Sequence, residues 1–277
     1  LAAALTAAGY PLAAVAGESD ASRTRIETLL PGARIDKPTA VAKAADLLLL
    51  TVPDDALDNV VRMLVASGAI RSGQIIVHTS GRHGLQVLQP ALDVGARGIA
   101  LHPAMTFTGT DLDLERLIGC TYAVTCGPAD RAFVGSLVAD LGGRLVEVSE
   151  SNRELYHAAL AHGSNHLVTL VSQAMDMLRS AGTDDPARTL RPLLAAALDN
   201  VLVFGGAALT GPIVRGDLET VRAHLRSMTA EAPETLQSYV AMGRATANRA
   251  VADGRLQPRR AAALVEALND ALAGIRA

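Results

Sequence analysis

The sequence predicts an α/β domain with a doubly wound parallel sheet, followed by an all-helical domain. As far as Val148, short apolar runs alternate with helical stretches, which is typical of strands joined by right-handed crossover helices. After Ser149 only helical periodicity is found. The 277 residues are enough for two domains with sizeable cores. We therefore expect the sheet domain over 1–149 and the helical domain over 150–277.

The first elements are a helix ending near Gly9, a strand near Leu12–Ala16 and a helix over Ala21–Leu30. Ala45–Val52 is apolar on both faces, as in a buried parallel strand, and the proline that follows ends it. The remaining predicted elements of this domain, in order, are a helix over Leu57–Ala66, a strand over Gln74–His78, a helix over Leu85–Ala91, strands over Gly98–Leu101 and Tyr122–Thr125, a helix over Ala129–Leu141 and a strand over Arg144–Val148.

The opening of the chain reads as the second half of a dinucleotide-binding βαβ unit. Such a unit normally begins with a strand and a G-x-G-x-x-G loop, whose amides bind the pyrophosphate. No glycine precedes Gly9, and the chain does not begin with Met. We expect that first strand and loop, roughly 15–25 residues, to precede Leu1 in the native chain.

The second half is predicted to begin with a long helix from about Ser151 to Gly182. Ligands of open α/β sheets bind beyond the carboxyl ends of the strands, so we expect the site between the two domains. The further helices predicted here span Pro186–Phe204, Leu218–Ala230, Pro233–Ala252 and Pro258–Ile275.

Composition excludes several function classes. The net charge of −3 provides no basic field for nucleic acid, and no uninterrupted run of about 18 apolar residues predicts a membrane span. The two cysteines, Cys120 and Cys126, match no metal motif and are expected to be free thiols in a reducing compartment. We expect a cytoplasmic protein that binds neither nucleic acid nor membranes.

The segment after the second predicted strand carries side chains suited to phosphate. The side chains that suit the 2′-phosphate of NADP are Ser19, Ser22, Arg23 and Arg25. The acidic Glu18 and Asp20 would instead suit the 2′-hydroxyl of NAD. We favour NADP, with NAD as the other possibility. The alternative is that the arginines only decorate the start of a helix.

Polar groups also follow the next two predicted strands. After the first, Val52, Pro53 and Asp54 suit a dinucleotide, because the proline frees the backbone to run along it and the aspartate can cap the next helix. After the second, Ser80 and the amides around Gly81 could bind a substrate carboxylate or the cofactor. Each of these could also be an ordinary strand end.

Candidates for proton transfer lie at the next strand end and on the long helix. His102 ends the third of these strands, while His157, Ser164 and Asn165 lie near one face of the helix. Both lysines of the chain, Lys37 and Lys43, fall in its first fifth, so the helical half has none to act as a catalyst.

Two other interpretations of the helix stay open. His162 and His166 are spaced for zinc, and Glu154 with His157 for di-iron, but no H-E-x-x-H and no second E-x-x-H occurs. We therefore expect no metal. Alternatively, the polar residues form a buried structural network at the domain interface.

The most distinctive string of the second half is A-L-T-G-P-I-V-R-G-D, Ala208–Asp217. Its glycines and proline predict a shaped loop, on which Thr210 and Arg215 could bind substrate, the arginine by clamping a carboxylate. A structural pairing of Arg215 with Asp217 at a helix junction is the alternative.

These segments together resemble a family of Rossmann-like proteins whose helical C-terminal domain is of unknown function. The resemblance covers essentially the whole chain and rests on five strings: L-L-L-L-T-V-P-D, H-T-S-G, L-H-P-A-M-T-F, L-Y-H-A-A-L-A-H-G-S-N and A-L-T-G-P-I-V-R-G-D. The family is similar to the wider group of 6-phosphogluconate dehydrogenase, ketopantoate reductase and pyrroline-5-carboxylate reductase. This implies an NAD(P)H-dependent reductase that forms a homodimer through a helical domain like that of 6-phosphogluconate dehydrogenase.

The resemblance implies a small 2-oxo acid as substrate, with ketopantoate as the leading candidate. A cyclic imine is the other option. In the wider group a Lys and an Asn four residues apart often act on the interdomain helix. Asn165 matches that Asn, but Ala161 stands in the Lys position. We expect His157 as general acid, His102 as its alternative, and Asn165 to orient the carbonyl. The rival functions are a non-catalytic nucleotide- or metabolite-binding protein and, more weakly, a structural partner of another enzyme.

Overall fold

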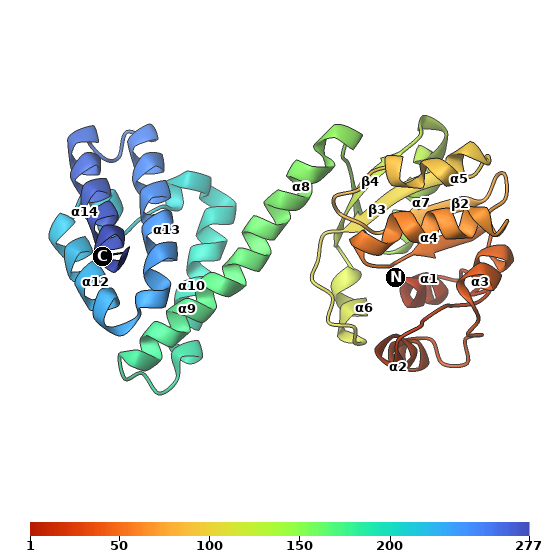
Figure 1. Cartoon of the computed structure of the whole chain (residues 1–277), viewed down its shortest axis with the longest axis horizontal. Coiled ribbons are helices and arrows are strands. Elements are labelled where there is room, and N and C mark those ends of the chain that lie inside the picture. Colours follow the sequence, from red (N-terminus) through yellow and green to blue (C-terminus); the bar gives the residue numbers. More distant parts are fainter. Residues whose placement is uncertain (277) are drawn as a thin grey trace. The chain divides into compact units, whose positions relative to one another are not determined.

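The computed structural model describes residues 1–276, which form two compact units, Leu1–Gly163 and a second unit that begins at Ser164 (Figure 1). The sequence pattern changes at residue 149, but the first unit extends to Gly163. It includes the helix α8 (Arg153–Leu160) because Arg153 and Tyr156 on that helix hydrogen-bond to residues of the sheet domain.

The first unit is built on one five-stranded sheet with the strands in sequence order. The strands are β1 (Leu47–Leu50), β2 (Ile75–His78), β3 (Arg97–Pro103), β4 (Thr121–Cys126) and β5 (Arg144–Glu147). Strands β1, β2 and β3 are parallel, as are β4 and β5. The predicted α/β class is confirmed, and the sheet is mainly parallel.

Two details of the predicted sheet are wrong. Strand β4 pairs with β3 in antiparallel fashion, because the connection over 104–120, which includes helix α6 (Leu112–Leu117), reverses the chain without crossing over the sheet. The predicted strand over Leu12–Ala16 is reduced to one bridge, between Val15 and Ile35.

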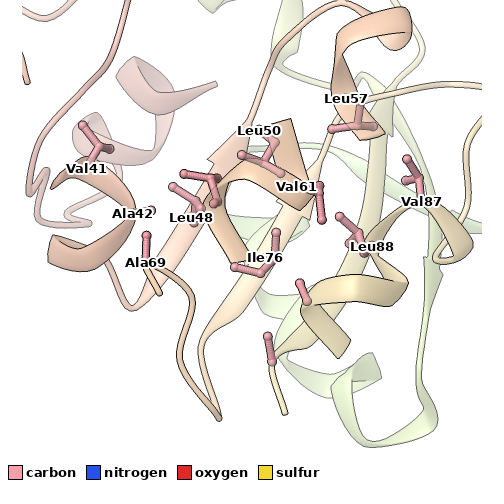
Figure 2. Packing of buried hydrophobic residues seen from close by; sticks show 13 residues of the cluster. Val41, Ala42, Leu48, Leu50, Leu57, Val61, Ala69, Ile76, Val87 and Leu88 are labelled. Atoms are coloured by element: carbon pink, nitrogen blue, oxygen red, sulfur yellow. The ribbon is translucent and has the colours of Figure 1, made fainter. Parts of the chain in front are cut away.

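Helices cover both faces of this sheet, as side-chain alternation in the strands requires. Leu48 and Leu50 of β1 and Ile76 of β2 belong to one core, which Figure 2 shows together with Leu57 and Val61 of helix α4 (Asp54–Ala66). Ala42 and Leu88 also belong to that core, whereas Val77, Ile99 and Tyr122 belong to a second core. The other helices of the unit are α1 (Ala2–Ala7), α2 (Asp20–Leu29), α3 (Pro38–Ala44), α4 (Asp54–Ala66), α5 (Gln89–Asp93) and α7 (Arg131–Asp140).

The second unit is helical throughout its described residues. After a π-helical turn at Ala161–Asn165 the helices are α9 (His166–Ser180), α10 (Pro186–Phe204), α11 (Pro212–Arg215), α12 (Leu218–Glu231), α13 (Pro233–Ala252) and α14 (Pro258–Arg276). The core of this unit lies between α11, α12, α13 and α14 and includes Val221, Leu236 and Leu264. The predicted helices of this half are therefore confirmed.

Helix α10 contributes little to that core. Pro186 is its one buried residue, and six of its large apolar side chains are exposed, namely Leu193, Leu198, Val201, Leu202, Val203 and Phe204. The segment Pro186–Arg215 is long and apolar enough to cross a membrane by length and composition. A stretch of 18 residues within it has a mean hydropathy of 1.7, and none of that stretch is buried. We expected no such segment, because we required an uninterrupted apolar run. Buried core helices of soluble proteins can have the same length and apolar composition.

The buried Tyr122 ring gives a test of the sheet core. Its hydroxyl has no hydrogen-bond partner among residues 1–276, and a buried hydroxyl without a partner costs about 1–3 kcal/mol. Tyr122→Phe should therefore keep or increase the free energy of unfolding, by up to about 1 kcal/mol, in urea denaturation. A clear loss of stability would mean that the hydroxyl is hydrogen-bonded in solution.

Candidate functional site

The carboxyl ends of β1, β2 and β3 lie at the same edge of the sheet, because the three strands are parallel. Val52 and Pro53 follow β1, and Asp54 is the first residue of α4. We expected Asp54 to cap that helix, but it does not. Pro53 occupies the cap position, and the Asp54 carboxylate pairs instead with Arg82 at 3.5 Å. This ion pair links the segment after β1 to the loop after β2.

The loop after β2 is held closed by His78 and Ser80. The Ser80 amide donates to His78 Nδ1 at 3.2 Å, so this nitrogen carries no proton. His78 Nε2 must then donate to the Gly84 carbonyl, 2.8 Å away. Burial, with a smaller contribution from the nearby Arg153 charge, lowers the pKa of His78 to about 4. The Ser80 hydroxyl accepts from the His83 amide. This hydroxyl, which we expected to bind substrate or cofactor, therefore stabilises the loop.

Arg153, the first residue of α8, is fully buried beneath this edge of the sheet. Its Nε donates to Thr125 Oγ1 at 2.8 Å, and one Nη donates to the Ser80 carbonyl at 3.2 Å. The other Nη donates to the carbonyls of Ala100 and Ala123, at 2.9 and 3.1 Å. Every acceptor in this set is uncharged. A buried guanidinium thus joins the loop after β2 to the two neighbouring strands, β3 and β4.

The same segment of chain holds the loop at a second point. Glu150, three residues before Arg153, accepts from the amides of Leu85 and Gln86 at 2.7 and 3.1 Å. A side chain on Gly84 would collide with this carboxylate, so the approach requires glycine there. The loop from His78 to Gln86 is therefore fixed at both ends by the residues that lead into α8.

His102 on β3 is half-buried and hydrogen-bonds to α8. Its Nδ1 lies 3.0 Å from the Tyr156 hydroxyl, and the two rings meet edge to face. Burial lowers the pKa of His102 to about 4, with a further contribution from the charge of Arg153. Burial also raises the pKa of Tyr156. Both groups are therefore uncharged at neutral pH.

Gly81 separates His102 from His157. A Cβ atom on Gly81 would lie 2.6 Å from His157 Cδ2 and 3.1 Å from His102 Nε2. The two imidazole rings have centroids 6.2 Å apart and are nearly perpendicular. The absence of a side chain at Gly81 is what lets both rings approach the loop backbone. The structure thus brings together the predicted residues Ser80, Gly81, His102 and His157.

A second cluster of predicted residues lies at the start of α2. Ser19 is its N-cap and accepts from the Ser22 amide at 3.2 Å. The two hydroxyls are 2.9 Å apart, and Arg25 Nη2 donates to Ser22 Oγ at 3.3 Å. Arg23 is exposed. Hydroxyls, a guanidinium and the amino end of a ten-residue helix form a set of groups that suits a phosphate.

The remaining predicted residues belong to the second unit. Ser164 and Asn165 end the π-helical turn, and Thr210 and Arg215 flank or end α11. Asp217 caps α12 by accepting from the amide and hydroxyl of Thr220, at 3.1 and 2.7 Å. These two hydrogen bonds and, to a smaller extent, the charge of Arg215 lower the pKa of Asp217, so the alternative in which Arg215 pairs with Asp217 at the helix junction stays open. Among the residues that the structure describes, no group of three potential ligands could hold a metal ion.

Sequence reasoning missed Arg153 and Tyr156. A basic residue in the first turn of a helix is disfavoured by the helix dipole, so Arg153 at the start of a predicted helix needed another explanation. That conflict was the available signal for a buried arginine. Tyr156 offered no comparable signal, because its hydrogen bond to His102 spans 54 residues.

His78 makes the stability of the first unit depend on pH. Its folded pKa of about 4 lies below the ordinary value of 6.5, so between these values the unfolded chain binds more protons than the folded one. Stability is complete above pH 6.5 and falls as the pH drops toward 4, by up to about 3 kcal/mol for this histidine. His78→Gln, which keeps a donor for Gly84, should be less stable at pH 8 but should remove about half of the dependence between pH 6.5 and 4.5 in urea denaturation, because the similarly lowered pKa of His102 supplies the other half. His224→Gln, at an exposed position on α12, is the control and should keep the wild-type slope.

Comparisons with known proteins agree with this architecture. Residues 1–103 match a Rossmann-like domain, and residues 120–246 match a domain of unknown function, DUF2520. A search of curated protein sequences found no match. Among solved structures, a candidate NADP oxidoreductase of Bacteroides fragilis is 20% identical, with a TM-score of 0.76, over 89% of this chain and 92% of that one.

Two further structures are named as reductive enzymes. A reductive aminase of Aspergillus terreus, in complex with NADPH and ethyl levulinate, is 20% identical with a TM-score of 0.61, over 91% of this chain and 89% of that one. The pyrroline carboxylate reductase of Plasmodium falciparum, with NADP bound, is 12% identical with a TM-score of 0.56, over 95% of this chain and 92% of that one. At these identities the likeness concerns the fold. The resemblance drawn from the sequence is confirmed: the chain combines a Rossmann-like domain with a helical DUF2520 domain.

Proposed function

We propose that this protein is an NADPH-dependent reductase acting on the C=O or C=N bond of a small molecule. The observation that carries the proposal is the pair His102 and His157 beside Gly81, at the carboxyl edge of the parallel strands. Ligands of doubly wound sheets bind at that edge. Fold relatives named as an NADP oxidoreductase, a reductive aminase and a pyrroline carboxylate reductase support the same class of reaction.

The proposed cofactor is NADP, with its 2′-phosphate at the start of α2. The hydroxyl of Ser22 and the guanidinium groups of Arg23 and Arg25 would hold the phosphate, and Ser19 would keep the helix start in place. Val52, Pro53, Asp54 and Ser80 remain the residues proposed to lie along the cofactor. When bound, NADPH would supply the hydride.

The proposed general acid is His157. The His102 ring has a pKa of about 4 and so carries no second proton at neutral pH, which makes it unsuitable as an imidazolium acid. Asn165 would orient the substrate carbonyl, and its place in a π-helical turn supports this, because such turns are frequent at functional sites. Gly81, Ser164, Thr210 and Arg215 are the proposed substrate contacts, together with Ser80.

Within this class we favour a small 2-oxo acid of the ketopantoate type as substrate, and a cyclic imine as the alternative. An arginine such as the exposed Arg215 could bind a carboxylate through two parallel hydrogen bonds. NADPH oxidation with a panel of 2-oxo acids and imines would identify the class. Nucleotide binding without turnover of any substrate would favour a non-catalytic binding protein.

We further propose a cytoplasmic homodimer formed through the helical unit. Helices α9 and α10 expose apolar side chains, among them Val168, Leu202 and Phe204, and an exposed apolar patch of this kind marks an interaction surface. A membrane-embedded role is less suited to α10, because Arg188, Arg191 and Asp199 lie within it and a charge in a bilayer costs several kcal/mol.

The role of His157 can be tested in the turnover assay. A positioned general acid contributes roughly 10²–10⁴-fold, so His157→Gln should lower kcat by about that factor and leave NADPH affinity nearly unchanged. The pH profile of kcat should also lose its basic limb. Near-normal turnover in this variant, together with loss in His102→Gln, would transfer the role to His102.

Cofactor choice can be tested by titration with both nucleotides. Arg23→Ala and Arg25→Ala should each weaken NADPH binding by about 1.5–3 kcal/mol, the contribution of a charge-assisted hydrogen bond, and spare NADH. Arg179→Ala, which removes a surface arginine from α9, is the control and should change neither affinity. Equal losses for the two nucleotides would contradict a 2′-phosphate site at this position.

The dimer can be tested by sedimentation velocity. Leu202→Glu places a charge on the exposed face of α10 and should weaken self-association at least about tenfold, because a buried leucine contributes about 1.5–3 kcal/mol. Ile118→Glu, in the first unit, is the matched control, since the two side chains are 77% and 74% exposed. A monomeric wild-type protein would refute the proposal directly.

A further inference from the structure

The pairing of His102 with Tyr156 has a consequence for the proton on the imidazole ring. His102 Nδ1 and the Tyr156 hydroxyl are 3.0 Å apart, and one of them must donate to the other. If the hydroxyl donates, the ring proton is on Nε2. If Nδ1 donates, Nε2 carries a lone pair. The two arrangements present opposite hydrogen-bonding groups beside Gly81.

The surroundings of the two groups favour the hydroxyl as donor. His102 Nδ1 is the hydrogen-bond partner that the structure gives to Tyr156 Oη, and a half-buried hydroxyl proton needs an acceptor. Donation from Nδ1 would use the phenol oxygen as acceptor and leave its proton without one within the described chain. The second proton that would let both ring nitrogens donate is disfavoured, because the ring is buried near the Arg153 charge.

The other ring nitrogen is available to a ligand. Within the part of the chain that the structure describes, His102 Nε2 has no hydrogen-bond partner, yet it is not among the buried polar atoms left unpaired, so solvent reaches it. It lies next to Gly81, since a Cβ atom there would be 3.1 Å from it. The charged and titratable groups nearest the ring are Arg153 and His157 on α8, His78 on β2 and Asp54 on α4.

We propose that Tyr156 is a positioning residue that donates to His102 Nδ1 and so holds the ring in the tautomer whose Nε2–H faces the space beside Gly81. In this arrangement His102 is a neutral hydrogen-bond donor to the substrate oxygen or nitrogen, while His157 supplies the proton. The assignment of the tautomer rests on the hydrogen-bond geometry and on the burial that keeps the ring neutral. Its catalytic consequence rests on the proposed reductase function.

The tautomer can be measured on the resting protein by ¹⁵N NMR of histidine-labelled samples, without substrate or cofactor. We expect His102 Nε2 to give a protonated, pyrrole-type resonance and Nδ1 a pyridine-type resonance shifted by its hydrogen bond. In Tyr156→Phe the Nδ1 resonance should move to the position of an imidazole nitrogen that accepts no hydrogen bond. A protonated Nδ1 in the wild type, or an unchanged Nδ1 resonance in the variant, would overturn the proposal.

The chain offers a matched control in its second unit. His224 Nδ1 lies 2.8 Å from the Tyr239 hydroxyl, and the rings meet edge to face at 6.1 Å. Tyr239→Phe removes the same hydroxyl from an equivalent pair on α12 and α13. It should change the His224 resonances, leave those of His102 unchanged and preserve turnover. A Tyr239→Phe protein that lost activity equally would indicate a general effect of the lost hydroxyl.

Turnover separates this positioning role from a structural one. Fixing the tautomer and orientation of a functional histidine typically contributes about 10–100-fold, so Tyr156→Phe should lower kcat by that factor with an unchanged KM for NADPH. On a His102→Ala background the same substitution should have no further effect, because Tyr156 acts through His102. Additive losses would contradict the proposal. If the wild type reduces no substrate, the reductase function fails while the NMR result still decides the tautomer.

Discussion

The buried Arg153 guanidinium is the interaction on which the arrangement of this edge of the sheet depends. Moving a charge out of water costs several kcal/mol, and only good geometry offsets it. Here four uncharged oxygens, from the loop after β2 and from β3 and β4, satisfy the group. The antiparallel β4 is therefore tied to the parallel strands through a side chain of α8. Loss of the guanidinium would leave the carbonyls of Ser80 in the loop, Ala100 in β3 and Ala123 in β4 without this donor.

Much of the fold could be predicted from local patterns, but much of the site could not. The run of leucines in β1 and the bounds of α10 and α13 follow from apolar periodicity and from prolines at the helix starts. The direction of β4 depends on a connection whose sequence has no crossover pattern. Ser80, Gly81 and His102 were predicted because residues after parallel strands share an edge. Their actual partners, Arg153 and Tyr156, come from a distant segment, and no local pattern encodes such contacts.

The exposure of helix α10 is another feature that local sequence patterns did not predict. Its composition reads as that of a buried helix, yet its large apolar side chains are exposed, with Leu202 and Val203 more than 70% accessible. The core of the second unit lies between α11, α12, α13 and α14 and does not require them. An apolar face that its own unit leaves uncovered marks a surface for association. The composition of α10 shows only that the helix is apolar, whereas the packing of the unit shows that this face is exposed.

The electrostatics of the first unit connect its stability to its proposed chemistry. Burial and the Arg153 charge keep both His78 and His102 neutral, with pKa values of about 4. For His78 this neutrality is structural, since the loop after β2 uses both of its ring nitrogens. For His102 one nitrogen bonds Tyr156 and the other stays open. A neutral donor beside a fixed positive charge stabilises negative charge that develops on a bound oxygen, without first having to lose a proton of its own. The buried Arg153 that ties β3, β4 and the loop after β2 together thus also sets the charge environment in which the proposed reduction would take place.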